Sequence, residues 1–151
     1  MRLVTSIAIN AAPLFVWQIL TDPLATSACM PGLVTWETLE PQRRFRLVVA
    51  WAEQNGSGGL RIPAVIEWTE LLPPVQMGIC TRLFLGSSTL DINGTARLQA
   101  ITAGQTRLEI SSEIDTPNPV MAQMVNQAAV RILQPFLRCL RGRAEQLAMG
   151  G

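Results

Sequence analysis

The chain is predicted to form one α+β domain, in which a curved antiparallel β-sheet grips a long C-terminal helix. Three observations lead to this fold class. An apolar stripe with three- and four-residue steps runs through residues 118–149. Residues 33–115 largely alternate between apolar and polar side chains, as β-strands do. A helical stripe of roughly 30 residues, rising 1.5 Å per residue, also needs a concave partner of matching length.

The N-terminal part of the chain is predicted to form one strand and two short helices. Residues 3–9 carry alternate side chains on one face and read as a strand. Asn10-Ala11-Ala12-Pro13 and Asp22-Pro23 each place proline where a helix begins and no backbone N–H is needed. We therefore expect helices from Pro13 and from Pro23 to about Ala28, ended by Met30-Pro31-Gly32.

Six further strands are expected to follow, which makes a sheet of seven strands. Their ranges are about 33–39, 44–51, 60–71, 75–85, 89–101 and 105–115. In the third strand of the chain, Phe45 and Trp51 belong to the larger apolar set, so this set should face inward. Ile66 and Trp68 hold the same position in the fourth strand. Residues 54–59 are rich in glycine and read as a hairpin tip.

The last predicted helix begins at Asn118-Pro119, a capping residue followed by proline. Its apolar stripe consists of Met121, Met124, Val125, Ala128, Ile132, Phe136 and Leu140. Pro135 lies in the helix interior, where the missing N–H predicts a kink. This kink could open space beneath Met124 and Ala128, or it could only let the helix follow the sheet; the second reading is slightly favoured.

Composition excludes several kinds of chemistry. The 151 residues are 48% hydrophobic and 15% charged, which fits a single domain with a generous interior or a lined cavity. The chain has no histidine, so a Ser-His or Cys-His nucleophile and a histidine-bearing metal site are excluded. It has no lysine, which excludes a Schiff base. The net charge of +1 gives no field that would attract nucleic acid.

Cysteine usage and the N-terminus indicate a cytoplasmic protein. Cys29, Cys80 and Cys139 stand too far apart for a C-x-x-C type cluster, so we expect three reduced thiols packed as small hydrophobic groups. Residues 1–7 contain only a short, interrupted apolar run and do not resemble a signal peptide. No window reaches the roughly 18 apolar residues of a membrane span, so no integral membrane segment is expected.

Several motifs resemble the SRPBCC proteins and, within them, the group of carbon monoxide dehydrogenase accessory subunits. The opening motifs are Ile9-Asn10-Ala11-Ala12-Pro13, Val16-Trp17, Asp22-Pro23 and Ala28-Cys29-Met30-Pro31-Gly32. The later motifs are Glu67, Leu71-Leu72-Pro73-Pro74, Gly94-Thr95-Ala96-Arg97-Leu98 and Gly104-Gln105-Thr106-Arg107-Leu108. The resemblance spans nearly the whole chain, so we treat residues 1–151 as one such domain.

The resemblance implies a helix-grip fold, with a seven-stranded antiparallel sheet around the C-terminal helix and an apolar cavity between them. Combined with the predicted faces, it suggests a pocket lined by strand and helix residues. These are Phe45, Trp51, Ile66, Trp68, Met77, Leu108, Met121, Met124 and Ala128. The cavity mouth would be formed by Met30, Pro31, Gly32, Gly56 and Gly58. Ordinary core packing of the same residues is an equally good reading of the pattern alone.

Two functions remain open at this point. The first is binding of a hydrophobic small molecule such as a lipid, quinone or isoprenoid, or an accessory role to a redox enzyme complex, which the resemblance to the dehydrogenase accessory subunits implies. The alternative is a polyketide cyclase or dehydrase acting on an aromatic or polyketide substrate. Catalysis would need a carboxylate or arginine inside the apolar cavity, yet strand alternation places most charged residues outside. Arg82 is the exception, because its strand does not alternate cleanly. We expect no cofactor, no metal site and no catalytic residue.

Overall fold

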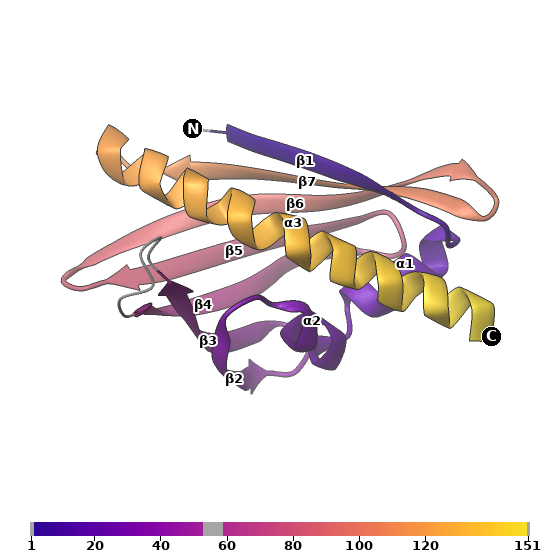
Figure 1. The fold of residues 1–151 in the computed structure, drawn as a ribbon, viewed down its shortest axis with the longest axis horizontal. Helices are drawn as coiled ribbons and strands as arrows, with labels where there is room; N and C mark the ends of the chain where they lie inside the picture. Colours follow the sequence, from indigo (N-terminus) through magenta and orange to yellow (C-terminus); the bar gives the residue numbers. More distant parts are fainter. Residues whose placement is uncertain (1, 53–58, 151) are drawn as a thin grey trace.

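The computed structural model describes residues 2–52 and 59–150, without the side chains of residues 51, 52 and 59. Its elements in chain order are β1 (Arg2–Ile9), α1 (Pro13–Leu20), α2 (Pro23–Cys29), β2 (Leu33–Glu40), β3 (Arg44–Ala52), β4 (Gly59–Leu72), β5 (Gln76–Leu85), β6 (Ser88–Thr102), β7 (Gln105–Asp115) and α3 (Pro119–Gly150). The strands form one seven-stranded sheet in the order β1-β7-β6-β5-β4-β3-β2. The predicted α+β helix-grip fold is therefore confirmed, with both short helices directly after the first strand (Figure 1).

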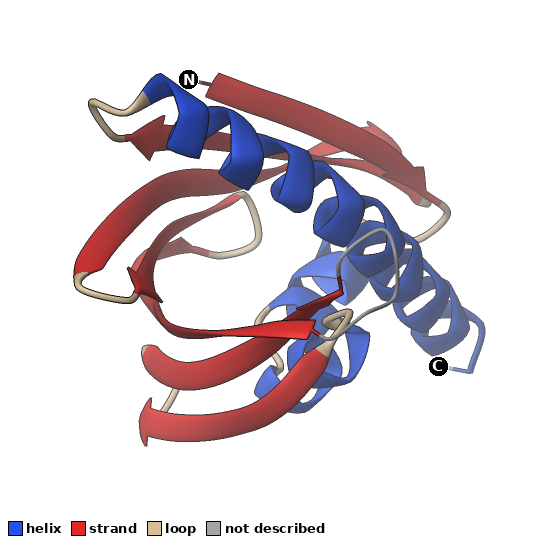
Figure 2. Cartoon of the chain, turned by 60° about the vertical axis from the view of Figure 1, so that its left-hand side comes forward, coloured by secondary structure: helices blue, strands red, loops and turns tan. Residues whose placement is uncertain are grey.

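The sheet is antiparallel throughout, and its register determines which side chains share a face. Across β4 and β5, Trp68 lies opposite Ile79 and Glu67 lies opposite Cys80. Because successive residues of a strand point to opposite faces, Trp68 and Ile79 share the inner face and Glu67 and Cys80 share the outer face. We use "inner face" below for the side of the sheet that α3 covers. The curl of the sheet around α3 is visible in Figure 2.

Helix α3 begins as its sequence predicts. The side-chain oxygen of Asn118 accepts hydrogen bonds from the backbone N–H groups of Val120 and Met121, at 3.1 and 3.3 Å. The helix then continues through Pro135 to its end. It packs against α1, α2, β1 and β7 and crosses the sheet obliquely (Figures 1 and 2).

The buried apolar residues of the described chain form two separate clusters. The larger one joins α1 and the end of α2 to the C-terminal half of α3 and to the sheet, and includes Trp17, Phe45, Trp68, Phe136 and Leu140. The smaller one consists of Leu90, Ile114, Ala122 and Val125, under the N-terminal half of α3. The domain is thus held mainly from the C-terminal half of its long helix.

One expectation from the sequence is wrong. Cys29 and Cys139 are not reduced thiols but form a disulfide, with a Cα–Cα distance of 5.4 Å. Their separation of 110 residues hid this pairing, which arises because α2 packs against α3. Cys80 is a free cysteine, as expected. Within the described residues, no helix is both long and apolar enough to cross a membrane.

Candidate functional site

An aromatic row crosses the inner face at the β2 side of the sheet. The ring centroids of Trp36 and Phe45 are 5.1 Å apart, and those of Phe45 and Trp68 are 4.9 Å apart. Both pairs are tilted, an arrangement that aromatic rings favour. The Nε1 atom of Trp36 is buried and has no hydrogen-bond partner. The row therefore combines a large apolar surface with one unused hydrogen-bond donor.

Next to this row, the centre of the inner face retains accessible surface. Ile66 on β4, Ile79 and Thr81 on β5, and Ile92 on β6 are only partly buried, although they face the side covered by α3. Accessible surface on these side chains means that a water-sized sphere fits beside them. The sequence predicted Ile66 as a lining residue, and the structure places it among these partly buried side chains.

Gly94 adds to this space because it brings no side chain to the inner face. A Cβ atom built on Gly94 would have as its three nearest neighbours Ser111 O, Ser112 Oγ and Ile79 O, at 3.1, 3.7 and 3.8 Å. All three belong to neighbouring strands, so among the described residues nothing in α3 approaches that position as closely. The helix leaves this part of the sheet uncovered. We call Ile66, Ile79, Thr81, Ile92 and Gly94 the central inner face.

The remaining predicted strand residues lie deeper. Phe45, Trp68, Met77 and Leu108 are all buried in the larger apolar cluster. Phe45 and Trp68 adjoin the central inner face, because Phe45 lies opposite Ile66 and Trp68 opposite Ile79. Leu108 lies further away in β7, where it pairs with Ile7 of β1. The structure thus brings Phe45, Ile66 and Trp68 together but not Leu108.

The three predicted helix residues differ in position. Ala128 is buried and Met121 is half-buried against the smaller cluster. Met124, in contrast, leaves 55% of its surface exposed, so its predicted inward position is wrong. The buried residues of this half of α3 are Ala122, Val125 and Ala128, which rotates the covered stripe away from Met124.

The predicted mouth is only partly described. Gly32 has a φ of +72°, and the backbone N–H of Ala50 on β3 donates to its carbonyl oxygen at 2.7 Å. Met30 is half-buried and packs against the larger cluster, and Pro31 is also half-buried. Gly56, Gly58 and the side chain of Trp51 lie outside the described residues. On the described side, the mouth segment 30–32 is therefore joined firmly to β3.

Charged side chains do not line the inner face. In the described strands, no Asp, Glu or Arg occupies an inward position. Arg82, whose face the sequence left open, points outward and pairs with Asp91 through Nε at 2.8 Å and Nη2 at 3.1 Å. That hydrogen-bonded pair lowers the pKa of Asp91 and raises that of Arg82. The polar groups at inward positions of β5 and β7 include the hydroxyls of Thr81 and Ser112.

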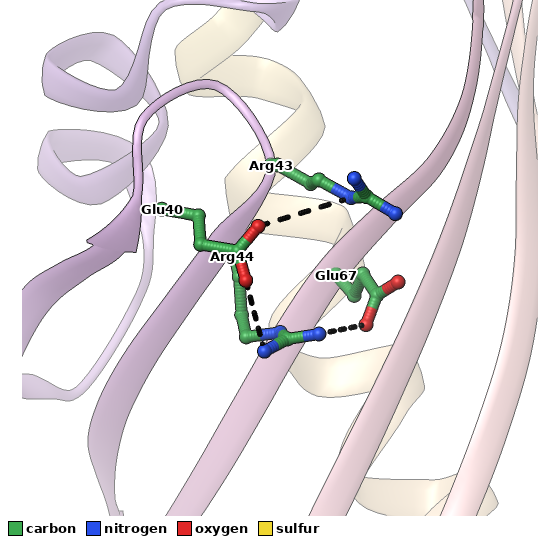
Figure 3. A network of polar contacts seen from close by, with 4 residues as sticks. All are labelled: Glu40, Arg43, Arg44 and Glu67. Atoms are coloured by element: carbon green, nitrogen blue, oxygen red, sulfur yellow. Dashed lines mark hydrogen bonds and ion pairs between the residues drawn. The ribbon is translucent and has the colours of Figure 1, made fainter.

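A separate groove of about 390 Å³ lies on the outer face. It is lined by Leu39, Arg44, Val65, Glu67, Cys80, Arg82 and Phe84. Figure 3 shows how Arg44 is held there: its guanidinium contacts Glu40 at 3.0 Å and Glu67 at 3.2 Å, while Arg43 approaches Glu40 at 4.0 Å. Because carboxylates already pair with both arginines of the lining, the groove offers no unbalanced charge to select a ligand. We therefore place the candidate site on the inner face.

Sequence reasoning missed Trp36, Ile79, Thr81 and Ile92. Trp36 was missed because β2 does not alternate cleanly, and the register of β2 against β3 shifts near both ends of the strand. Ile79 and Thr81 lie in β5, where the pattern of residues 77–84 was ambiguous. Ile92 alternates with Asp91 and Asn93 and could have been found from that alternation.

Fold and site together define a helix-grip domain with an apolar, uncharged inner face. Residues 1–145 match the family model described as polyketide cyclase / dehydrase and lipid transport. The chain therefore belongs to this family, within the SRPBCC superfamily. The family match does not single out the group of carbon monoxide dehydrogenase accessory subunits. A search of curated proteins found no match.

Solved structures show the same fold at low sequence identity. A conserved protein from Geobacillus kaustophilus is 19% identical over 97% of this chain and 96% of its own, with a TM-score of 0.81. The Zhui aromatase/cyclase from Streptomyces sp. R1128 is 18% identical over 97% and 94%, with a TM-score of 0.69. A START superfamily protein from Mycobacterium smegmatis is 20% identical over 97% and 98%, with a TM-score of 0.67.

Proposed function

We propose that this chain binds a hydrophobic small molecule, of lipid, quinone or isoprenoid type, between the central inner face and the first half of α3. One observation carries the proposal: Ile66, Ile79 and Ile92 keep accessible surface on the covered side of the sheet. Apolar surface left beside water is unfavourable by about 25 cal/mol per Å². A ligand that covers these side chains recovers that free energy.

The chemistry of the space favours binding over catalysis. Ligand pockets are mostly apolar, with a few polar groups that orient the ligand. Here the isoleucines supply the apolar wall, and Thr81 and Ser112 supply hydroxyls. General acid–base catalysis requires a titratable group within reach of the substrate. The described strands offer none at an inward position.

A space-filling substitution tests the proposal. Thr81→Phe places a ring in the central inner face, so we expect it to abolish uptake of a fluorescent fatty acid. Thr95→Phe is the matched control, because Thr95 is a half-buried threonine of the neighbouring strand that faces outward. We expect the control to keep its affinity. Uptake is followed by titration and stability by urea unfolding.

The two measurements together decide the outcome. If the space exists, Thr81→Phe loses uptake while its free energy of unfolding changes by less than about 1 kcal/mol. A tightly packed interior would instead be overfilled, and the variant would lose about 1–3 kcal/mol. Unchanged uptake, or this destabilisation, contradicts the proposed site.

A polyketide cyclase or dehydrase is the second candidate function. The aromatic row favours it, since Trp36, Phe45 and Trp68 present ring surfaces on which a flat substrate can pack. The family description, which includes polyketide cyclases, points the same way. Incubation with linear aromatic polyketide precursors, followed by mass spectrometry, tests this function. Loss of water or a new ring supports it, and unchanged precursor that nevertheless binds supports the binder.

An accessory role to a redox enzyme and a cytoplasmic location also remain proposals. The former is tested by affinity purification of the full chain from its native host, where co-purified subunits of a redox enzyme would support it. The latter is tested by cell fractionation. The disulfide between Cys29 and Cys139 weighs against a permanently reducing compartment, because disulfides persist mainly in oxidising ones.

A further inference from the structure

The disulfide lies next to the mouth segment 30–32. Cys29 is the last residue of α2, and Met30 follows it directly. Its partner Cys139 lies on α3, near Phe136 and Leu140 of the larger cluster. The bond therefore fastens one end of the mouth segment to the long helix. At the other end, the carbonyl oxygen of Gly32 accepts the hydrogen bond from Ala50 of β3 at 2.7 Å.

Helix α2 depends on such external support. It contains only seven residues, and isolated helices shorter than about 12 residues are marginal in water. Its local stabilisation includes the Asp22 cap, which accepts from the Leu24 N–H at 3.0 Å. Its packing partners include α1 and α3. The disulfide is the covalent link between α2 and α3, so breaking it leaves the end of α2 held by packing alone.

We propose that the Cys29–Cys139 disulfide is a redox latch that controls ligand exchange through the mouth. The proposal rests on the proposed binding function. With the bond intact, segment 30–32 is tied at both ends and closes the space beside α3. With the bond reduced, the end of α2 and Met30 can move away from the core, and the ligand enters and leaves faster.

The chemical step is thiol–disulfide exchange with a dithiol reductant. One thiolate of the reductant attacks a cysteine sulfur and forms a mixed disulfide, and the other cysteine leaves as a thiolate. Cys139 is half-buried whereas Cys29 is buried, so attack at Cys139 is the more accessible route. The second thiol of the reductant then displaces the protein. Two electrons and two protons pass to the cysteines, and the dithiol becomes an internal disulfide.

The experiment compares oxidised and dithiothreitol-reduced protein in stopped-flow exchange of a fluorescent fatty acid. We expect exchange to be about fivefold faster or more in the reduced protein, within the usual range of coupling between two sites. The Cys29→Ser/Cys139→Ser double variant should behave like the reduced protein under both conditions. Cys80→Ser is the control and should keep the redox response. Circular dichroism verifies that each form is folded.

A second measurement separates the latch from the binding function. Hydrogen exchange of residues 24–33 should be faster in the reduced protein than in the oxidised one, whether or not the probe binds. Equal probe exchange in both forms overturns the latch and leaves the binding function intact. Titration of three thiols in folded, air-oxidised protein also overturns it. If no probe binds in either form, the proposed function fails, and equal hydrogen exchange in residues 24–33 then overturns the latch as well.

Discussion

At the scale of single residues, Gly32 has the most constrained backbone of the mouth segment. Its φ of +72° is a conformation that other residues adopt only at a cost. A Cβ atom there would also lie 2.5 Å from the carbonyl oxygen of Ala50, a backbone atom that cannot move aside alone. Gly32 therefore faces both backbone strain and a steric clash on substitution.

Alanine substitution should separate these two effects. Gly86 has a similar φ of +67°, but nothing lies within 4 Å of its added Cβ. We expect Gly86→Ala to lower the free energy of unfolding by about 1 kcal/mol through strain alone. Gly32→Ala should lower it by about 3 kcal/mol, because the clash adds to the strain. Urea unfolding measures both, and equal losses would show that the contact with Ala50 does not matter.

The free cysteine gives a prediction about pH. Partial burial raises the pKa of the Cys80 thiol, and the nearby Asp91 carboxylate raises it further, against the opposing effect of Arg82. Only the thiolate is alkylated, so reaction with iodoacetamide should set in at a higher pH than in the urea-unfolded chain. Asp91→Asn removes a raising charge and should shift the onset to lower pH. Mass spectrometry of labelled Cys80 measures the profile, and an onset at the unfolded pH would contradict this account.

At the scale of elements, helix starts could be predicted because their signals are local. The cap of α3 at Asn118 and that of α2 at Asp22 both form as the sequence indicates. The strands were also recognisable, since alternation needs only neighbouring residues. The Cys29–Cys139 bond and the inward position of Trp36 could not be predicted. The former depends on packing between distant helices, and the latter on register shifts in β2.

The two short helices differ in their caps, which leads to a paired prediction. Asp22 caps α2 with its side chain, whereas Ala12 at the same position of α1 offers no side-chain hydrogen bond. Asp22→Ala should lower the free energy of unfolding by about 1 kcal/mol, and Ala12→Ser should raise it by up to about 1 kcal/mol. Thermal unfolding of both variants measures the changes. A stabilised Asp22→Ala variant would show that the cap plays no part in holding α2.

At the scale of the whole molecule, the two apolar clusters divide α3 into unequal halves. The C-terminal half contributes Phe136, Leu137, Leu140 and Ala144 to the larger cluster and carries the disulfide. The N-terminal half contributes only Ala122 and Val125 to the buried part of the smaller one, while Val120 and Met124 are exposed. The proposed ligand space adjoins this weaker half. Fewer buried contacts lower the free energy of local opening.

Hydrogen exchange along α3 should therefore be uneven and should respond to ligand. We expect the amides of residues 122–130 to exchange at least about tenfold faster than those of residues 137–144, equivalent to about 1.4 kcal/mol less protection. A bound fatty acid covers the central inner face and supplies the apolar contacts that the N-terminal half lacks. It should slow exchange in residues 122–130 and leave residues 137–144 nearly unchanged. Thr81→Phe should show the slowed pattern without ligand, because its ring fills the same space. Uniform protection along the helix, or a ligand effect confined to its C-terminal half, would place the binding space elsewhere in the domain.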